Sequence, residues 1–199
     1  MLFYTTFSIR EKQAIVQAPQ LTLKDFLALP EGDVAHELID GKAVPKLAPK
    51  RFHSKTQKAM LRLLDDWAME KGEVGLEWAV TLKRNDRDWC PVPDLLFVAL
   101  DRLPPGYNED GPCPVPPNVA IEIISPDQTF GAMAEKAFDY LMVGTLSVWI
   151  VDPRAKTVTV FHPEAVPVTY RGNTTIDEPQ LPELNTSAQT IFDRAGLLG

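Results

Sequence analysis

The sequence predicts an α/β (α+β) fold in which a mixed central β-sheet is flanked by helices and preceded by a β-hairpin. Two observations carry this prediction. Segments whose apolar residues recur at helical spacing alternate with segments that have strand patterns. The helical segments are 53–71 and 129–143, and the strand segments are 73–82, 92–100, 119–125, 147–151 and 157–162. The strand–helix–strand run over 119–151 predicts a right-handed crossover between parallel strands.

The N-terminal elements are expected to be a short helix and the hairpin. Thr22, with Asp25 three positions later, predicts a capping box that opens the helix. Strand patterns over 34–39 and 42–47 flank Asp40-Gly41, a pair that favours a type I′ hairpin turn.

Each long element is expected to bury one side. Apolar residues recur at positions i, i+3, i+4 and i+7 in the first long helix, and every second residue of 73–82 is apolar. The residues expected to be buried are Met60, Leu63, Leu64 and Trp67 in the first long helix, Ala134, Phe138, Leu141 and Met142 in the second, and Val74, Leu76, Trp78, Val80 and Leu82 in the strand. The segment 101–118 is expected to be a loop, and 165–199 to add one or two short strands and a terminal helical turn.

Composition indicates an ordinary globular chain. Of its 199 residues, 45% are hydrophobic and 24% are charged, which suits one sizeable core. No apolar run reaches the length of a membrane span and the N-terminus lacks a signal-peptide pattern, so we expect a cytoplasmic protein. Cys90 and Cys113 make no disulfide framework and fit a reducing compartment. Residues 1–20 show no clear period and predict a loosely held tail, whereas 21–199 are expected to form a single domain.

Charge is unevenly distributed along the chain. The net charge of −7 argues against nucleic acid as a partner. Between positions 42 and 62, however, seven basic residues occur without an acid: Lys42, Lys46, Lys50, Arg51, Lys55, Lys58 and Arg62. This basic segment is compatible with a polyanion bound at one face, and equally with a solvated loop and helix surface.

A carboxylate in the middle of an apolar strand needs an explanation. Glu122 stands in the run V-A-I-E-I-I, where it must be paired, protonated or bound to a cation. Asp94, twenty-eight positions earlier, begins another apolar strand. If the two strands are neighbours, two carboxylates meet and a divalent cation can compensate their repulsion. Hard oxygen ligands favour Mg²⁺ or Mn²⁺, and three histidines without a CxxC pair argue against a structural zinc site.

Lys136 is a candidate third component of this site. It is the one Lys or Arg between Arg102 and Arg154, on the helix that follows Glu122. A lysine above two metal-bound carboxylates can hold or deprotonate a water molecule, which suits phosphodiester hydrolysis. Because Lys136 lies off the expected core stripe, we expect Lys136→Ala to spare the fold.

The same residues carry a resemblance to a known family. Pro93-Asp94 followed by Glu122 resembles the signature of the PD-(D/E)XK nuclease superfamily, with Ile124 in the usual place of the lysine and Lys136 displaced onto the next helix. Six segments in order resemble the Uma2 family, which is grouped with the restriction endonucleases. They are HELIDGKAV at 36–44, a histidine at 53, PVPDLLFV at 91–98, NVAIEIISPD at 118–127, EKAFDYLMVG at 135–144 and VWIVDP at 148–153.

The resemblance implies a restriction-endonuclease-like fold, a Mg²⁺-dependent site that cuts DNA, and a homodimer. Carried onto the matching positions, Asp94 and Glu122 would bind the metal ion, which we expect to bring their carboxylates within about 5 Å of each other. Lys136 would orient the water molecule. Glu37 would be an auxiliary acid, unless it pairs with Lys42 across the hairpin.

Further residues complete the expected site. The carbonyl of Ile123 is a candidate metal ligand, because an apolar residue can contribute only its backbone. His53 is expected to contact phosphate or substrate. From the charge pattern, Lys55, Lys58 and Arg62 are expected to bind DNA at the rim of the cleft that contains Asp94.

Two other functions fit parts of the pattern. A module that binds nucleic acid or protein without cutting could keep the same fold, and the acidic body of the chain favours that reading. A glycosidase with two carboxylates would need no metal ion but would require a sugar cleft lined by aromatic side chains. The tryptophans fall mainly on core-like strand faces, which weighs against a glycosidase.

Overall fold

The computed structural model describes residues 20–30 and 32–198. The tail expected over 1–20 therefore lies outside the described residues apart from Gln20, and the single domain over 21–199 stays a prediction. Within the described ranges, no helix is long and apolar enough to cross a membrane.

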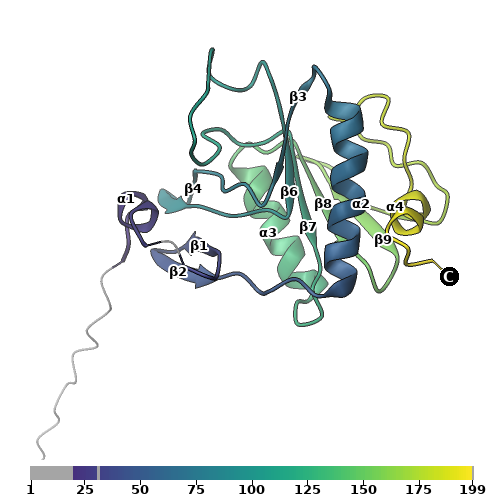
Figure 1. Cartoon of the computed structure of the whole chain (residues 1–199), viewed down its shortest axis with the longest axis horizontal. Helices are drawn as coiled ribbons and strands as arrows, with labels where there is room; N and C mark the ends of the chain where they lie inside the picture. The colour runs from purple at the N-terminus through teal and green to yellow at the C-terminus, as the bar shows by residue number, and fades with distance from the viewer. Residues whose placement is uncertain (1–19, 31, 199) are drawn as a thin grey trace, which may run out of the picture.

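A six-stranded mixed sheet forms the centre of the molecule (Figure 1). Its spatial order is β10-β9-β8-β7-β6-β3, and every neighbouring pair is antiparallel except β7 and β8. The strands are β3 (Gly72–Leu76), β6 (Leu95–Ala99), β7 (Val119–Ile123), β8 (Ser147–Asp152), β9 (Thr157–Phe161) and β10 (Val168–Arg171). The parallel pair is joined through α3 (Phe130–Met142), so the predicted mixed sheet and its crossover connection are confirmed.

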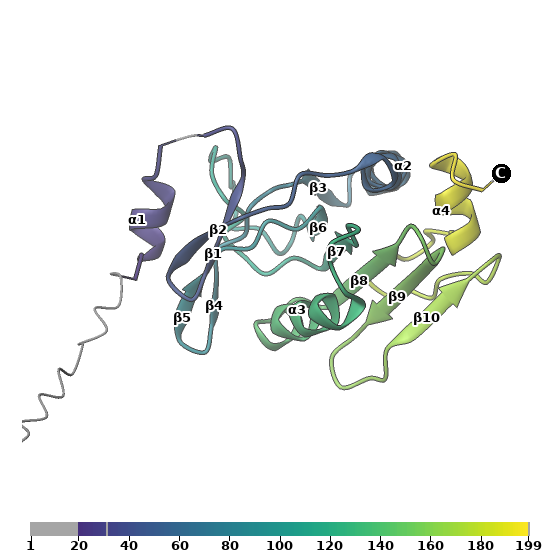
Figure 2. The same ribbon diagram turned by 90° about the horizontal axis from the view of Figure 1, so that it is seen from below.

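Helices cover both faces of this sheet. Figure 2 shows α2 (Arg51–Ala68) and α4 (Ala188–Arg194) on one side and α3 on the other. Successive residues of a strand point to opposite faces. In β7, Ile121 and Ile123 therefore join the core beneath α2, whereas Ala120 joins the core beneath α3. The same alternation directs Glu122 toward α3.

The buried side of α3 differs from the predicted stripe. Met133, Ala137 and Tyr140 are buried, whereas Phe138 is 51% exposed and Met142 is 85% exposed. The helix carries apolar residues on two stripes, and the stripe with the small Ala137 faces the sheet. This orientation puts the Tyr140 ring inside the core, where its hydroxyl reaches Glu122. In α2 the prediction holds better, because Met60 and Leu64 are buried.

The single strand predicted over 73–82 is wrong. β3 ends at Leu76, and Glu77 adopts a left-handed backbone with φ of 49° that turns the chain out of the sheet. Val80 then forms an isolated bridge with Cys113. The chain continues into a small hairpin of β4 (Leu82–Arg84) and β5 (Arg87–Trp89).

The N-terminal hairpin is formed as predicted. β1 (His36–Ile39) pairs with β2 (Lys42–Pro45), and the turn residues Asp40 and Gly41 both have positive φ, as a type I′ turn requires. The preceding helix α1 (Leu23–Leu27) has the predicted capping box between Thr22 and Asp25. Two backbone hydrogen bonds between Leu38 and Cys90 attach the hairpin to the end of β5.

A buried carboxylate fixes the C-terminal segment to the sheet. Glu178 accepts hydrogen bonds from the hydroxyl of Ser147 and, at 2.8 Å, from the indole of Trp149. His162 Nε2 lies 3.3 Å from the same carboxylate. The segment then leads into α4, which packs beside α2 on the same side of the sheet (Figure 2).

Candidate active site

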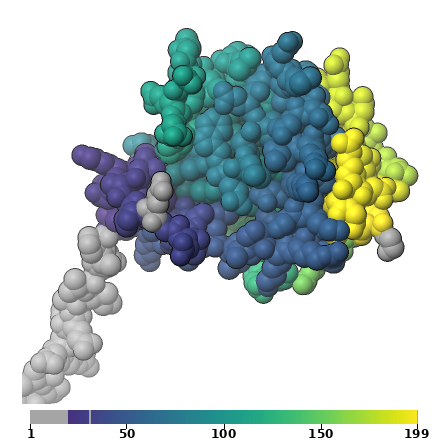
Figure 3. Space-filling model, in the orientation of Figure 1, coloured from purple at the N-terminus to yellow at the C-terminus, as the bar shows by residue number. Residues whose placement is uncertain are grey.

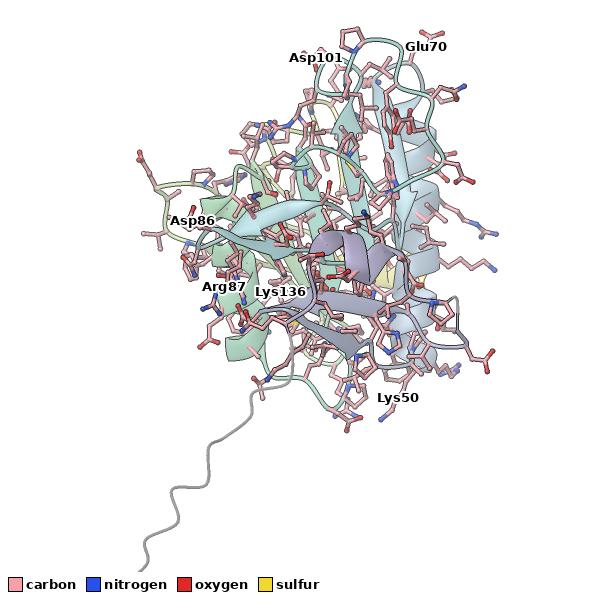
Figure 4. The ribbon with its side chains drawn as sticks, turned by 90° about the vertical axis from the view of Figure 1, so that its left-hand side faces the viewer. Lys50, Glu70, Asp86, Arg87, Asp101 and Lys136 are labelled. Carbon is pink, nitrogen blue, oxygen red and sulfur yellow. The ribbon has the colours of Figure 1, made fainter. Side chains whose placement is uncertain are left out.

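A polar cavity of about 170 Å³ lies where the hairpin, α2, the sheet and α3 meet. Figure 4 views the molecule from the hairpin side, with Lys136 labelled. The cavity is lined by Glu37, Val44, Pro45, Lys46, Leu47, His53, Asp94, Glu122, Ile123, Ser125, Gln128 and Lys136. All the residues expected to act in catalysis or to bind a metal ion therefore line one cavity.

Glu122 lies beneath α3 because of its place in β7. Glu122 is 4% exposed. Its carboxylate contacts two side chains that are four positions apart on α3. The Lys136 ammonium lies 2.8 Å from Glu122 Oε1, and the Tyr140 hydroxyl donates to the same oxygen at 3.0 Å. Residues i and i+4 share one face of a helix, so α3 presents both groups together. Sequence reasoning identified Lys136 but missed Tyr140.

Lys136 joins two acids. Its ammonium is 2.8 Å from Glu37 as well as from Glu122, and its side chain is 17% exposed. Lys136 is thus a mostly buried cation between two buried carboxylates. The burial of Lys136 between two acids argues against the expectation that Lys136→Ala spares the fold, since the change would leave both carboxylates without their cation.

The pKa values of Glu122 and Lys136 are both raised, for different reasons. Burial is the largest influence on Glu122, and together with the carboxylates of Asp94 and Glu37 it outweighs the Lys136 charge, so the pKa of Glu122 rises to about 7. Burial alone would lower the pKa of Lys136, but the carboxylates of Glu122 and Glu37 raise that pKa well above its ordinary value. The lysine therefore remains charged near neutral pH.

Asp94 stands beside Glu122 because β6 and β7 are neighbours, as predicted. Leu95 pairs with Ile121, which places the preceding Asp94 next to position 122. The Asp94 carboxylate accepts a hydrogen bond from the backbone N–H of Ile123 at 2.7 Å. A side chain, rather than a backbone carbonyl, is therefore the acceptor at this point between the two strands. The structure therefore joins the two acids at one end of the sheet.

Two cationic or polar side chains also contact Asp94. Lys46 Nζ lies 3.1 Å from Oδ1, and His53 Nε2 lies 3.0 Å from Oδ2. Burial alone would raise the pKa of Asp94. The hydrogen bond from His53 and the charge of Lys46 outweigh burial, so the pKa of Asp94 lies below its ordinary value. Lys46 was missed as a site residue; its one sequence signal is membership of the basic segment, because its contact with Asp94 spans 48 positions.

Glu37 has a structural contact as well as a place in the cavity. It is buried in β1 and accepts the backbone N–H of Val92 at 2.8 Å. Its ion pair is with Lys136 on α3, so the pairing with Lys42 across the hairpin is not what the structure shows. The auxiliary role of Glu37 stays a prediction.

The predicted position of the basic residues is wrong. Lys55, Lys58 and Arg62 line a separate hollow of about 480 Å³ that also includes Arg194 of α4. Figure 3 shows the blue surface of α2 beside the yellow C-terminal residues on this face. A helix that has His53 inside the cavity directs residues two, five and nine positions later to other sides. Any contact that Lys55, Lys58 and Arg62 make with DNA would therefore lie outside the cavity that contains Asp94.

The donor set of the cavity fits a hard divalent cation in its chemistry. Asp94 and Glu122 supply carboxylate oxygens, and Ile123 lines the same cavity. Within 20–30 and 32–198, no group of three or more His, Cys, Asp or Glu side chains is arranged to hold a metal ion. Two ammonium ions, from Lys46 and Lys136, contact these acids instead. An entering ion would replace part of that positive charge.

Comparisons with known proteins agree with the fold. The family model Uma2, described as “Putative restriction endonuclease”, matches residues 23–189, which include the whole acidic cavity. A crystal structure described as “a putative nuclease belonging to DUF820” from Anabaena variabilis ATCC 29413 is similar, with a TM-score of 0.77 and 28% sequence identity. That likeness covers 88% of this chain and 99% of the other, and it confirms the restriction-endonuclease-like fold. No curated protein matches the chain.

Proposed function

Because the chain belongs to the Uma2 family, we propose that it is a DNA endonuclease that hydrolyses phosphodiester bonds with the help of Mg²⁺ or Mn²⁺. One observation carries this proposal. Asp94, Glu122 and Lys136 come from three different elements and line one cavity, with the ammonium 2.8 Å from one carboxylate. The description of the family and that of the similar structure both name a nuclease.

The acids and the Ile123 carbonyl are proposed to hold the metal ion. When bound, such an ion neutralises charge on the phosphate and lowers the pKa of a water molecule. When all three carboxylates are ionised they exceed the two ammonium ions by one negative charge, which favours a cation. Lys46 is then free to leave Asp94 and contact a phosphate.

Lys136 is proposed to position groups rather than to accept a proton. Its raised pKa keeps the ammonium charged, so it is a poor base. The two carboxylates fix its place in the cavity, and its third N–H can be directed at a water molecule or a phosphate oxygen. It would thereby align the nucleophile and stabilise charge that develops on the phosphate.

A module that binds without cutting is the second candidate. It is favoured by the ion pairs, in which Lys46 and Lys136 offset part of the charge of the carboxylates without a metal ion. The two candidates differ in whether the cavity takes up a cation and whether DNA is cut.

A cleavage assay tests the proposal. The protein is incubated with single-stranded, duplex and branched DNA in Mg²⁺, in Mn²⁺ and in EDTA, beside Asp94→Asn. Asparagine is preferred to alanine because its amide oxygen can still accept the Ile123 N–H. Metal-dependent cutting by wild type that the variant lacks supports the nuclease. Binding of DNA without cutting in either metal favours the second candidate.

The basic hollow gives a separate prediction about DNA binding. Changing Lys55, Lys58 and Arg62 together to glutamine is expected to weaken binding equally for all sequences. The reason is that these residues would contact phosphates, so the logarithmic salt dependence should flatten by about 0.9 per lost contact. Titrations in EDTA at several salt concentrations measure this slope. An unchanged slope in the triple variant would exclude this face from the DNA path.

Partner and location are also part of the proposal. The resemblance to the family supports a homodimer acting on DNA. Cys90 and Cys113 are buried free thiols, which supports a reducing cytoplasm.

A further inference from the structure

A second hollow adjoins the acidic cavity. Its volume is about 230 Å³, and His53 lines both. It lies between the start of α2, the turn after β7 and the turn after β8. Its apolar lining consists of Phe52, Ile124, Pro126 and Pro153, and Phe52 is 42% exposed. An exposed aromatic ring among prolines, next to a candidate active site, is a surface suited to a flat apolar group.

Positive charge surrounds this apolar lining. Lys50, Arg51 and Arg154 line the same hollow, and no acid in the described part of the chain does so. The Arg51 guanidinium lies 5.7 Å from the centre of the Phe52 ring. Lys50 is already paired with Asp127 at 2.7 Å. The Lys156 ammonium lies 5.3 Å from the centre of the Phe52 ring, so Lys156 adds to the charge of Arg51 and Arg154. The hollow therefore combines an apolar surface with a cationic rim.

Two further observations point to a ligand at this end of α2. The first turn of the 18-residue helix contains no acid and has no side-chain cap, which leaves backbone N–H groups available. His53 is 6% exposed, and its Nδ1 is buried without a hydrogen-bond partner while Nε2 contacts Asp94. An unpartnered buried nitrogen between the two cavities is a candidate contact for a group that spans both.

We propose that this hollow binds an unpaired base of DNA next to the phosphodiester bond that is cut. A base offers a flat apolar face for Phe52 and the prolines, and its flanking phosphates match Arg51 and Arg154. Intact duplex keeps its bases stacked inside and presents mainly phosphates, which make no use of the apolar lining. The preferred substrate is therefore single-stranded or locally unpaired DNA. This inference rests on the proposed nuclease function and specifies its substrate.

Binding measurements in EDTA test the inference without relying on cleavage. Fluorescence anisotropy follows wild type and Phe52→Ala with a fluorescein-labelled single strand of mixed sequence and with its blunt duplex. Loss of one stacked base should weaken single-strand binding by about tenfold, within the usual range for base–aromatic stacking. Affinity for the duplex should stay within about twofold, because its contacts are phosphates.

A matched control separates the hollow from a general loss of exposed aromatic surface. Phe138 is similarly exposed, on α3, and does not line the hollow, so Phe138→Ala should bind both DNAs like wild type. Arg154→Ala should weaken both, since it would contact a phosphate. Unchanged single-strand affinity in Phe52→Ala, or an equal loss on duplex, overturns the inference. The metal-dependent cleavage assay with Asp94→Asn decides the proposed function independently of this result.

Discussion

Replacing Lys136 by methionine is expected to lower cleavage at saturating Mn²⁺ by about 100-fold or more, the usual scale for a lost acid–base or positioning group. Methionine keeps the unbranched stem but removes the ammonium between Glu37 and Glu122. The change should also cost about 3 kcal/mol of folding free energy, because two buried carboxylates lose their cation. Rates are therefore measured at a temperature at which circular dichroism shows the variant folded.

Lys46→Met is the matched comparison. It removes an equally buried ammonium from the same cavity, since both lysine side chains are 17% exposed. It should cost similar stability but reduce cleavage much less, because Lys136 keeps its two carboxylates. Equal losses in the two variants would mean that total positive charge matters and that Lys136 has no special position.

Glu122→Gln is expected to abolish Mn²⁺ binding while leaving the protein as stable as wild type, or more stable, in EDTA at about pH 8. The pKa of Glu122 is raised from 4.5 to about 7, so the folded protein holds its proton more tightly than the unfolded chain. Its contribution to stability is therefore fully present at low pH and is lost as pH rises through about 7. The shift corresponds to about 3 kcal/mol.

Glutamine has no proton to lose and still offers an oxygen to Tyr140. The stability difference between variant and wild type should therefore grow in favour of the variant between about pH 4.5 and 8. Denaturant titrations at several pH values in EDTA measure this difference, and calorimetry measures Mn²⁺ binding. A variant that is less stable at about pH 8 and binds Mn²⁺ like wild type would make Glu122 a structural ion-pair residue.

The sequence predicts the frame of this site because its signals are local. Alternation along β7 shows that Glu122 is buried, and the short crossover after it brings α3 back across the sheet. The neighbouring strand then places Asp94 beside it. These steps depend on strand and helix periods, which a few residues define.

The errors arise where local signals leave a choice. α3 has two apolar stripes, and the period alone does not distinguish the one with Phe138 from the one with Ala137. The alternation over 73–82 continues through Glu77, although that residue turns the chain with a positive φ. Lys46 was missed because its contact with Asp94 joins residues 48 positions apart, which the local strand pattern over 42–47 does not show. Lys55 was misplaced because charge density gives no direction around a helix.

Two of the three acids in the cavity also accept backbone N–H groups: Asp94 from Ile123 and Glu37 from Val92. Selection for a stable fold would keep both acids even in a relative that does not cut DNA. The presence of aspartate and glutamate at these positions in a relative is therefore weak evidence of activity. Glu122, which is costly to bury, and Lys136, which offsets that cost, are the pair whose loss would mark a degenerate enzyme.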